Sequence, residues 1–137
     1  MPTSSAGRRP PADGFSVVIM LPGRPNTGED DTRGQLALLA QADGDQGRFL
    51  ATTIRARSGN TSDRVYVHAK VGIVDDRWLT LGSANLNAQS FFNDSEVNVV
   101  SCDPALARDT RLRLWAAHLE RDIDQVAGDV ARFAAGP

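Results

Sequence analysis

The most constraining feature of this sequence is the order of its apolar segments, which alternate between strand-like and helix-like spacing. The first segment, FSVVIML at 15–21, is apolar at both odd and even positions, which is typical of a strand buried on both faces of a sheet. The segment at 30–43 instead places Leu36 and Leu39 on one helical face, and Gly44 follows it as a C-terminal cap. Strands interleaved with helices predict an α/β fold, an α-β-α sandwich around a mixed β-sheet.

The rest of the chain continues this pattern. The segments FLATTIRA (49–56) and SEVNVVS (95–101) are rich in β-branched and apolar residues and predict two further strands. Two similar runs flank Asp-Asp-Arg at 75–77, which predicts a β-hairpin. Asp103, with Pro directly after it, is a strong helix start, because Asp caps a first turn and Pro fits its first position. The apolar stripe of that helix is expected to continue to Val130.

The chain of 137 residues predicts one domain, because it is too short for two cores of ordinary size. Residues 1–14 are rich in Pro, Gly, Ser and Arg and lack apolar periodicity. We expect a disordered arm or linker there, and a single folded domain over 15–137. The longest apolar run near the start is too short to span a bilayer or to form the core of a signal peptide. We therefore expect a cytoplasmic or peripheral membrane protein.

Charge and cysteine content exclude several classes of protein. The formal net charge is −2 and the pI is near 5.6, so the overall field does not favour a polyanion such as nucleic acid. Cys102 is the only cysteine, which excludes an internal disulfide framework and a thiolate zinc cluster. The acidic pairs of the sequence lack the loop spacing of a set of metal ligands. The sequence therefore predicts neither a metal nor another cofactor.

His68 and Lys70 are the first candidates for chemistry. They are two positions apart on a predicted strand, so their side chains are expected to project from the same sheet face, roughly 7 Å apart at the backbone. Both can reach one phosphate from there. Gly72 is expected on that face too, where its missing side chain leaves space for a ligand. Taken alone, such a His-x-Lys pair is more often a solvated strand edge.

The spacing of further polar residues makes the pattern specific. The combined pattern is His68-x-Lys70-x4-Asp75-x6-Gly82-Ser83-x-Asn85. It resembles the HKD motif of the phospholipase D superfamily, and the resemblance extends over about residues 15–123. The segments VYVHAKVGIVDDRWLTLGSANLN, NDSEVNVV and RLRLWAAHLE are similar to the carboxy-terminal HKD half of a phospholipase D or a cardiolipin synthase-like enzyme.

The resemblance implies a two-step phosphodiester exchange, in which His68 attacks phosphorus, forms a phosphohistidine and is displaced by water or an alcohol. A neutral imidazole suits this role, because it is a nitrogen nucleophile that is plentiful at neutral pH. Lys70 would hold the non-bridging phosphate oxygens, and its positive charge disfavours the imidazolium form of its neighbour. Ser83 and Asn85 would donate further hydrogen bonds to the phosphate.

Two carboxylates and a second histidine need separate interpretation. Asp75 belongs to the catalytic motif by resemblance, whereas its odd separation from Lys70 places it on the opposite face or in the hairpin turn, where Asp commonly binds backbone amides. Glu96 resembles the carboxylate that orients the histidine ring in the family, the alternative being a solvated Glu at a strand end. His118 has no lysine two places on, so we expect it to be structural.

One HKD motif cannot complete the family's site, which the resemblance implies is built from two. The chain is therefore expected to form a homodimer, to pair with a lobe that carries the second motif, or to be the carboxy-terminal part of a two-motif enzyme, which we favour. A phospholipid is the expected substrate, with contact at the membrane periphery. Phosphatidyl transfer, an HKD nuclease and a non-catalytic lobe that binds lipid phosphate or a partner are the alternatives. The acidic pI disfavours nucleic acid.

Overall fold

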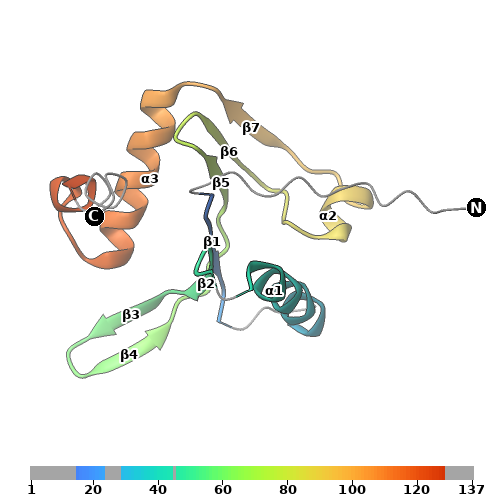
Figure 1. Cartoon of the computed structure of the whole chain (residues 1–137), viewed down its shortest axis with the longest axis horizontal. Coiled ribbons are helices and arrows are strands. Elements are labelled where there is room, and N and C mark those ends of the chain that lie inside the picture. The colour runs from blue at the N-terminus through green and yellow to red at the C-terminus, as the bar shows by residue number, and fades with distance from the viewer. Residues whose placement is uncertain (1–14, 24–28, 45, 129–137) are drawn as a thin grey trace, which may run out of the picture. The chain divides into compact units, whose positions relative to one another are not determined.

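The computed structural model describes residues 15–23, 29–44 and 46–128. The predicted arm at 1–14 lies outside these residues, as does the expected end of the last helix at Val130. The chain divides between Val67 and His68 into two compact units, which are treated separately below (Figure 1). We refer to them as the amino-terminal unit and the carboxy-terminal unit.

The amino-terminal unit begins with a strand, a helix and a second strand. β1 (Val17–Leu21) and β2 (Phe49–Thr53) pair in parallel, and α1 (Glu29–Asp43) forms part of the connection between them. A parallel pair requires such a crossover, because a tight turn can join only antiparallel strands. α1 is followed by Gly44, whose φ of 57° is the left-handed conformation that suits glycine at a helix end. The predicted strand, helix and cap are therefore confirmed.

A β-hairpin completes the described part of this unit. β3 (Arg55–Ser58) pairs with β4 (Thr61–Arg64) in antiparallel orientation, and the turn between them contains Gly59 at a φ of 57°. The single strand predicted over 49–56 is wrong in this detail, because it divides at Ile54 into β2 and β3. The two parts pair with different partners, β1 and β4, which the local sequence does not reveal.

The carboxy-terminal unit is built on a three-stranded antiparallel sheet. Its strands lie in the order β5 (Lys70–Val74), β6 (Trp78–Gly82) and β7 (Asn98–Ser101). A short helix, α2 (Ala88–Phe92), lies between β6 and β7 in the sequence, and α3 (Pro104–Leu119) follows β7. Figure 1 shows α3 beside the turn of the β5–β6 hairpin and α2 near the other end of that hairpin.

The core of this unit lies against α3. Leu79 of β6 is buried, and α3 contacts β6. Leu112 and Ala116 of α3 form a second buried group with Val126, from the helical segment that follows. The apolar stripe predicted for this helix is therefore confirmed in part: Leu112 and Val126 are buried, whereas Leu119 is 59% exposed.

The carboxy-terminal helix starts as predicted but ends earlier. Asp103 is the N-cap, and its carboxylate accepts hydrogen bonds from the amides of Ala105 and Leu106. Glu120 adopts a left-handed conformation with φ of 53°, which ends α3, and a separate helical turn follows at 123–128. The prediction of one continuous helix is therefore wrong. The break allows the second turn to fold back, so that Val126 packs on α3.

The class of fold is α/β, with helices and strands mixed along the chain. Within the described residues the strands form three small sheets: a parallel pair, an antiparallel pair and an antiparallel triplet. The predicted sandwich around one mixed sheet is therefore not confirmed. A search of the described residues finds no helix that combines the length and the apolar character needed to cross a membrane.

Candidate phosphate-binding site

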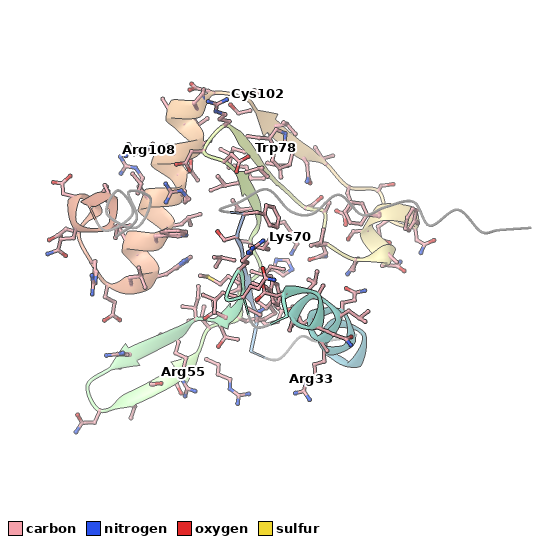
Figure 2. The ribbon with its side chains drawn as sticks, in the orientation of Figure 1. Arg33, Arg55, Lys70, Trp78, Cys102 and Arg108 are labelled. Carbon is pink, nitrogen blue, oxygen red and sulfur yellow. The ribbon has the colours of Figure 1, made fainter. Side chains whose placement is uncertain are left out.

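Lys70 and His68 lie at the start of the central hairpin of the carboxy-terminal unit. Lys70, which Figure 2 labels, is the first residue of β5 and is partly buried. Its Nζ donates a hydrogen bond to the backbone carbonyl of His68 at 2.8 Å. His68 is exposed and lies two residues before the strand. The prediction that both residues are on a strand therefore holds for Lys70 only. The ammonium group is nevertheless held next to the histidine backbone.

The register of the sheet shows what surrounds Lys70. Lys70 is paired with Gly82, and Gly72 with Thr80, so these four residues share one face. A Cβ atom at Gly72 would lie 3.1 Å from the Thr80 methyl group and 3.6 Å from the Trp78 ring. The space for a ligand that the sequence predicts at Gly72 is thus bordered closely by the side chains of Thr80 and Trp78. The residue directly across from Lys70 is Gly82, which also has no side chain.

The loop after β6 is fixed to the segment that enters β7. The amide of Ser83 donates to the carbonyl of Val97 at 3.0 Å, and the amide of Val97 donates to Ser83 Oγ at 3.0 Å. One residue further on, the amide of Ala84 donates to Asn98 Oδ1 at 3.2 Å. These reciprocal bonds hold two segments together that are 14 residues apart in the sequence. They bring the predicted residues Ser83 and Glu96 into one cluster.

Glu96 is the electrostatic centre of this cluster. Its partly buried carboxylate accepts hydrogen bonds from the hydroxyls of Ser83 and Ser90, which lower its pKa below the ordinary range. Burial acts in the opposite direction, and the positive charge of Lys70 adds a smaller lowering. Glu96 is therefore ionised at neutral pH and lies within electrostatic reach of Lys70. The predicted role of Glu96 in orienting the His68 ring stays a prediction.

Ser90 is a member of the cluster that sequence reasoning missed. It lies in α2, is 6% exposed, and accepts a hydrogen bond from Asn85 Nδ2 at 3.4 Å. Its amide donates to Asn87 Oδ1 at 2.9 Å, which caps α2. Ser90 thus contacts both Asn85 and Glu96. The Asn87 cap is the one local signal for this arrangement, since Ser90 lies outside the motif spacing.

Asp75 lies at the other end of the hairpin. It is exposed in the turn after β5, with φ of 52°, and Asp76 beside it has φ of 53°. Five residues of strand separate Asp75 from Lys70, which corresponds to roughly 17 Å. The structure therefore brings Asp75 into the turn and not into the cluster around Glu96. Of the two interpretations that the sequence left open for Asp75, the geometry matches the turn.

The neighbouring Asp76 anchors this turn to α3. Arg111 donates from Nε and Nη2 to the two carboxylate oxygens of Asp76 at 2.5 and 2.6 Å, and its guanidinium also lies 4.7 Å from the centre of the Trp115 ring. The bond from Arg111 lowers the pKa of Asp76. No local pattern in the sequence indicates this pair, because its members are 35 residues apart.

His118, the second histidine, lies in the last turn of α3 and is partly buried. Its Nδ1 atom is buried and has no hydrogen-bond partner. No group of three or more His, Cys, Asp or Glu side chains within the described ranges is arranged to hold a metal ion. The cluster described above, formed by Lys70, Ser83, Asn85, Ser90 and Glu96 with His68 beside it, is therefore the candidate site.

Comparison with known proteins shows the family of the chain. The sequence model of the family described as "Cardiolipin synthase, PLD-like domain" matches residues 12–117, which is most of the chain. The chain belongs to this family of phospholipase D-like domains, and so to the phospholipase D superfamily.

Curated relatives carry the same family name. The chain is 36% identical over 90 residues to phospholipase D zeta 1 of Arabidopsis thaliana, a match that covers 51% of this chain and 8% of that protein. It is 36% identical over 76 residues to phospholipase D A of Dictyostelium discoideum, covering 42% and 6%. It is 35% identical over 82 residues to phospholipase D1 of Saccharomyces cerevisiae, covering 47% and 5%. The chain thus spans less than a tenth of the length of these relatives.

Proposed function

We propose that this chain is one lobe of a phospholipase D-type phosphodiesterase that cleaves the phosphodiester bond of a phospholipid. The observation that carries the proposal is the position of Lys70, whose ammonium group is bonded to the backbone of His68 and acts electrostatically on Glu96. Phosphoryl transfer through a phosphohistidine requires three groups: a cation, a nucleophile and an ionised carboxylate.

His68 is the nucleophile of this proposal. Its neutral imidazole attacks phosphorus, a phosphorus–nitrogen bond forms, and the bond from phosphorus to the head-group oxygen breaks. The departing oxygen takes a proton from an acid outside this lobe. In the second step water attacks phosphorus, loses a proton to the same group, and the phosphorus–nitrogen bond breaks. The products are the free head-group alcohol and phosphatidic acid, and His68 is regenerated.

Lys70, Ser83 and Asn85 are the proposed ligands of the phosphate oxygens. Lys70 stabilises the negative charge that these oxygens carry in the transition state. Ser83 and Asn85 lie on the loop that is hydrogen-bonded to the β7 segment, which holds them in place before a substrate arrives. Asn85 Nδ2 has a second N–H beside the one that it donates to Ser90, whereas the Ser83 hydroxyl exchanges its bond to Glu96 for one to the phosphate.

Glu96 and Asp75 have different proposed roles. Glu96 is the carboxylate that orients the ring of His68, and its lowered pKa supports this role because the ionised form is the stronger acceptor for the hydrogen bond from the ring N–H. For Asp75 we propose a role in the hairpin turn, since the turn conformation with φ of 52° suits Asp better than most residues. Asp75 then supports the site through the hairpin and does not act on the substrate.

A second lobe is part of the proposal. The acid that protonates the departing oxygen is supplied by another HKD motif, either from a second copy, from a separate chain, or from another part of a longer protein. Exposed apolar side chains in the carboxy-terminal unit support association, among them Leu86, Phe92 and Val97 at 80%, 83% and 76% exposure. The α-β-α sandwich around a mixed β-sheet stays a proposal for this lobe.

Phosphatidyl transfer is the second candidate, and the description of the matching family as cardiolipin synthase favours it. The same residues serve both reactions, because an alcohol that replaces water in the second step gives a new phosphodiester. Nuclease activity and a non-catalytic lipid-phosphate-binding lobe remain as weaker proposals. Addition of glycerol or phosphatidylglycerol to the assay separates transfer from hydrolysis by its product.

The test is turnover of phosphatidylcholine and of bis(4-nitrophenyl) phosphate by the full chain. We expect His68→Ala and Lys70→Ala each to reduce turnover by roughly a thousandfold or more. His118→Ala is the matched control, since it removes the other histidine, and should retain turnover. Trapping of an acid-labile phosphoryl adduct on His68 is expected in the wild type. Unchanged turnover in His68→Ala, or an adduct on His118, would overturn the proposal.

A further inference from the structure

The β3–β4 hairpin of the amino-terminal unit has no role in the proposed chemistry, and its composition is unusual. All eight of its strand residues are exposed, and Ala56 is the only apolar side chain among them. Two-stranded hairpins without an apolar face are marginally stable in water. Such a hairpin is expected to contact something that its own unit does not supply.

One face of the hairpin is strongly basic. Arg55 is directly opposite Arg64, and Arg57 is opposite Ser62, so that alternation puts three arginines and one serine on the same face. The other face carries Ala56, Ser58, Thr61 and Asp63. We refer to the side formed by Arg55, Arg57, Ser62 and Arg64 as the arginine face.

The arginine face holds its charges close together without compensation. Directly opposite residues in an antiparallel pair have Cβ atoms about 5 Å apart, and like charges in such positions repel. Arg55 is held across the hairpin by Ser62, donating from Nε to its hydroxyl at 2.7 Å and from Nη2 to its carbonyl at 2.9 Å. In the part of the chain that the structure describes, no carboxylate forms an ion pair with any of these three arginines.

This arrangement is complementary to a surface of phosphate groups. An anion placed over the face relieves the repulsion between Arg55 and Arg64, and a guanidinium binds phosphate oxygens with two parallel donors. Arg55 uses two of its five N–H groups within the hairpin, so others remain for an external anion. The cross-strand bonds to Ser62 also reduce the side-chain freedom that binding would otherwise remove.

We infer that the arginine face of the β3–β4 hairpin docks the protein on an anionic lipid bilayer. The inference rests on the proposed function, which takes the substrate from a bilayer. A polynucleotide is the weaker alternative, because the chain carries a net charge of −2 and the hairpin has no aromatic side chain on which a base could stack. A few arginines on an otherwise acidic chain instead orient it on a flat, negatively charged surface.

The experiment is cosedimentation of the full chain with vesicles of phosphatidylcholine, with and without a minor fraction of phosphatidylserine. The variant R55Q/R57Q/R64Q is compared with R77Q/R108Q/R113Q, which removes the same charge from exposed positions of the carboxy-terminal unit. Each juxtamembrane arginine contributes roughly a fivefold gain in partitioning, so the hairpin variant should lose about a hundredfold on anionic vesicles. The control variant should lose much less, and the wild type should bind neutral vesicles weakly.

Three outcomes would overturn the inference. The first is an equal loss of binding to anionic vesicles in the two triple variants. The second is equal binding of the wild type to neutral and anionic vesicles. The third is arginine-dependent binding to a single-stranded oligonucleotide without binding to vesicles. Circular dichroism verifies that the variants are folded. Turnover of bis(4-nitrophenyl) phosphate, which needs no bilayer, separates the two proposals. It should be lost in His68→Ala and retained in R55Q/R57Q/R64Q, whereas binding to anionic vesicles should be retained in His68→Ala and lost in R55Q/R57Q/R64Q.

Discussion

Arg111 of α3 binds Asp76 of the β5–β6 turn through both carboxylate oxygens, at 2.5 and 2.6 Å. The side chains are only 16% and 28% exposed, and the guanidinium also lies over Trp115. This geometry makes the pair stronger than an ordinary surface ion pair. The pair fixes the turn of the β5–β6 hairpin, which carries Lys70 at its other end.

Replacement of Asp76 by Asn is expected to lower the free energy of unfolding by about 1–2 kcal/mol at pH 7, because one charge-assisted bond is lost and the Arg111 charge remains. Asp75→Asn is the matched control, since both residues have positive φ and Asn tolerates that conformation equally well. It should change stability by less than about 0.5 kcal/mol. Urea denaturation of the full chain measures both values, and equal losses would contradict the assigned anchor.

The same pair predicts a pH dependence. Because Arg111 lowers the pKa of Asp76 in the folded state, the stabilisation is fully present above the pKa of an unfolded aspartate, about 3.9, and is lost as the pH falls through the lower folded value. The stability difference between the wild type and Asp76→Asn should therefore shrink below about pH 4. A difference that stays constant from pH 7 to pH 3 would show that the ion pair is not its source.

Substitution of Gly82 is expected to have a steric effect. A Cβ atom at Gly82 would overlap Asn98 Oδ1 and the carbonyl oxygen of Val97, both from the strand-entry segment that holds the site loop. Gly82→Ala should therefore destabilise the chain by about 3 kcal/mol, the upper range for overpacking. Gly72→Ala is the control, because its nearest neighbour is the Thr80 methyl group at 3.1 Å, and should cost less than about 1 kcal/mol. Thermal unfolding should rank the two variants in this order.

Local signals explain how much of the fold could be predicted from the sequence. The Asp103 cap and the following Pro fix the start of α3 because capping depends on a few adjacent residues. The end of α3 was not predictable in the same way. The apolar spacing continues through Ile123 and Val126, and neither Gly nor Pro stands at Glu120, so periodicity alone favours one long helix.

The predicted strand includes His68, whereas β5 begins at Lys70. The reason lies in the tertiary structure. Continued pairing in the same register would place His68 opposite Ala84. The Ala84 amide instead donates to Asn98, and Ser83 is bonded to Val97, so the partner strand turns toward β7 before it reaches His68. The residue types of the site were predictable from motif spacing, whereas Ser90 depends on α2 folding over the loop.

The N-cap of α3 gives a further prediction. Asp103→Ala removes the acceptor of two backbone amides and should destabilise the chain by about 1 kcal/mol. Asp109→Ala is a suitable control, because it removes an exposed carboxylate of the same helix that pairs with Arg113 at 2.7 Å, and a solvent-exposed ion pair of this kind contributes little. Chemical denaturation should detect the difference, and a larger effect in Asp109→Ala would contradict the cap.

The final prediction concerns Ser90 and the charge of Glu96. Ser90→Ala removes one of the two hydroxyl donors that lower the Glu96 pKa, so this pKa should rise toward the ordinary value of a glutamate. At pH values above the ordinary pKa of a glutamate, ionised Glu96 contributes stability, and this contribution is lost as the pH falls through the lowered pKa of the folded state. In Ser90→Ala this loss should therefore begin at higher pH. Carbon NMR of the side-chain carboxyls can follow this, since the chain contains three glutamates and Glu96→Gln assigns the signal.

Two further variants decide whether Ser90 acts on Glu96 or merely stabilises α2. Ser95→Ala removes an exposed hydroxyl next to Glu96 and should leave its titration unchanged, whereas Ser90→Thr keeps a donor at the buried position and should restore much of the lowered pKa. A structural role alone would reduce the melting temperature of Ser90→Ala without moving the carboxyl titration. If the protein turns over a phosphodiester, the acid limb of its pH–rate profile should move to higher pH in Ser90→Ala and not in Ser95→Ala, because Glu96 orients His68 only while ionised.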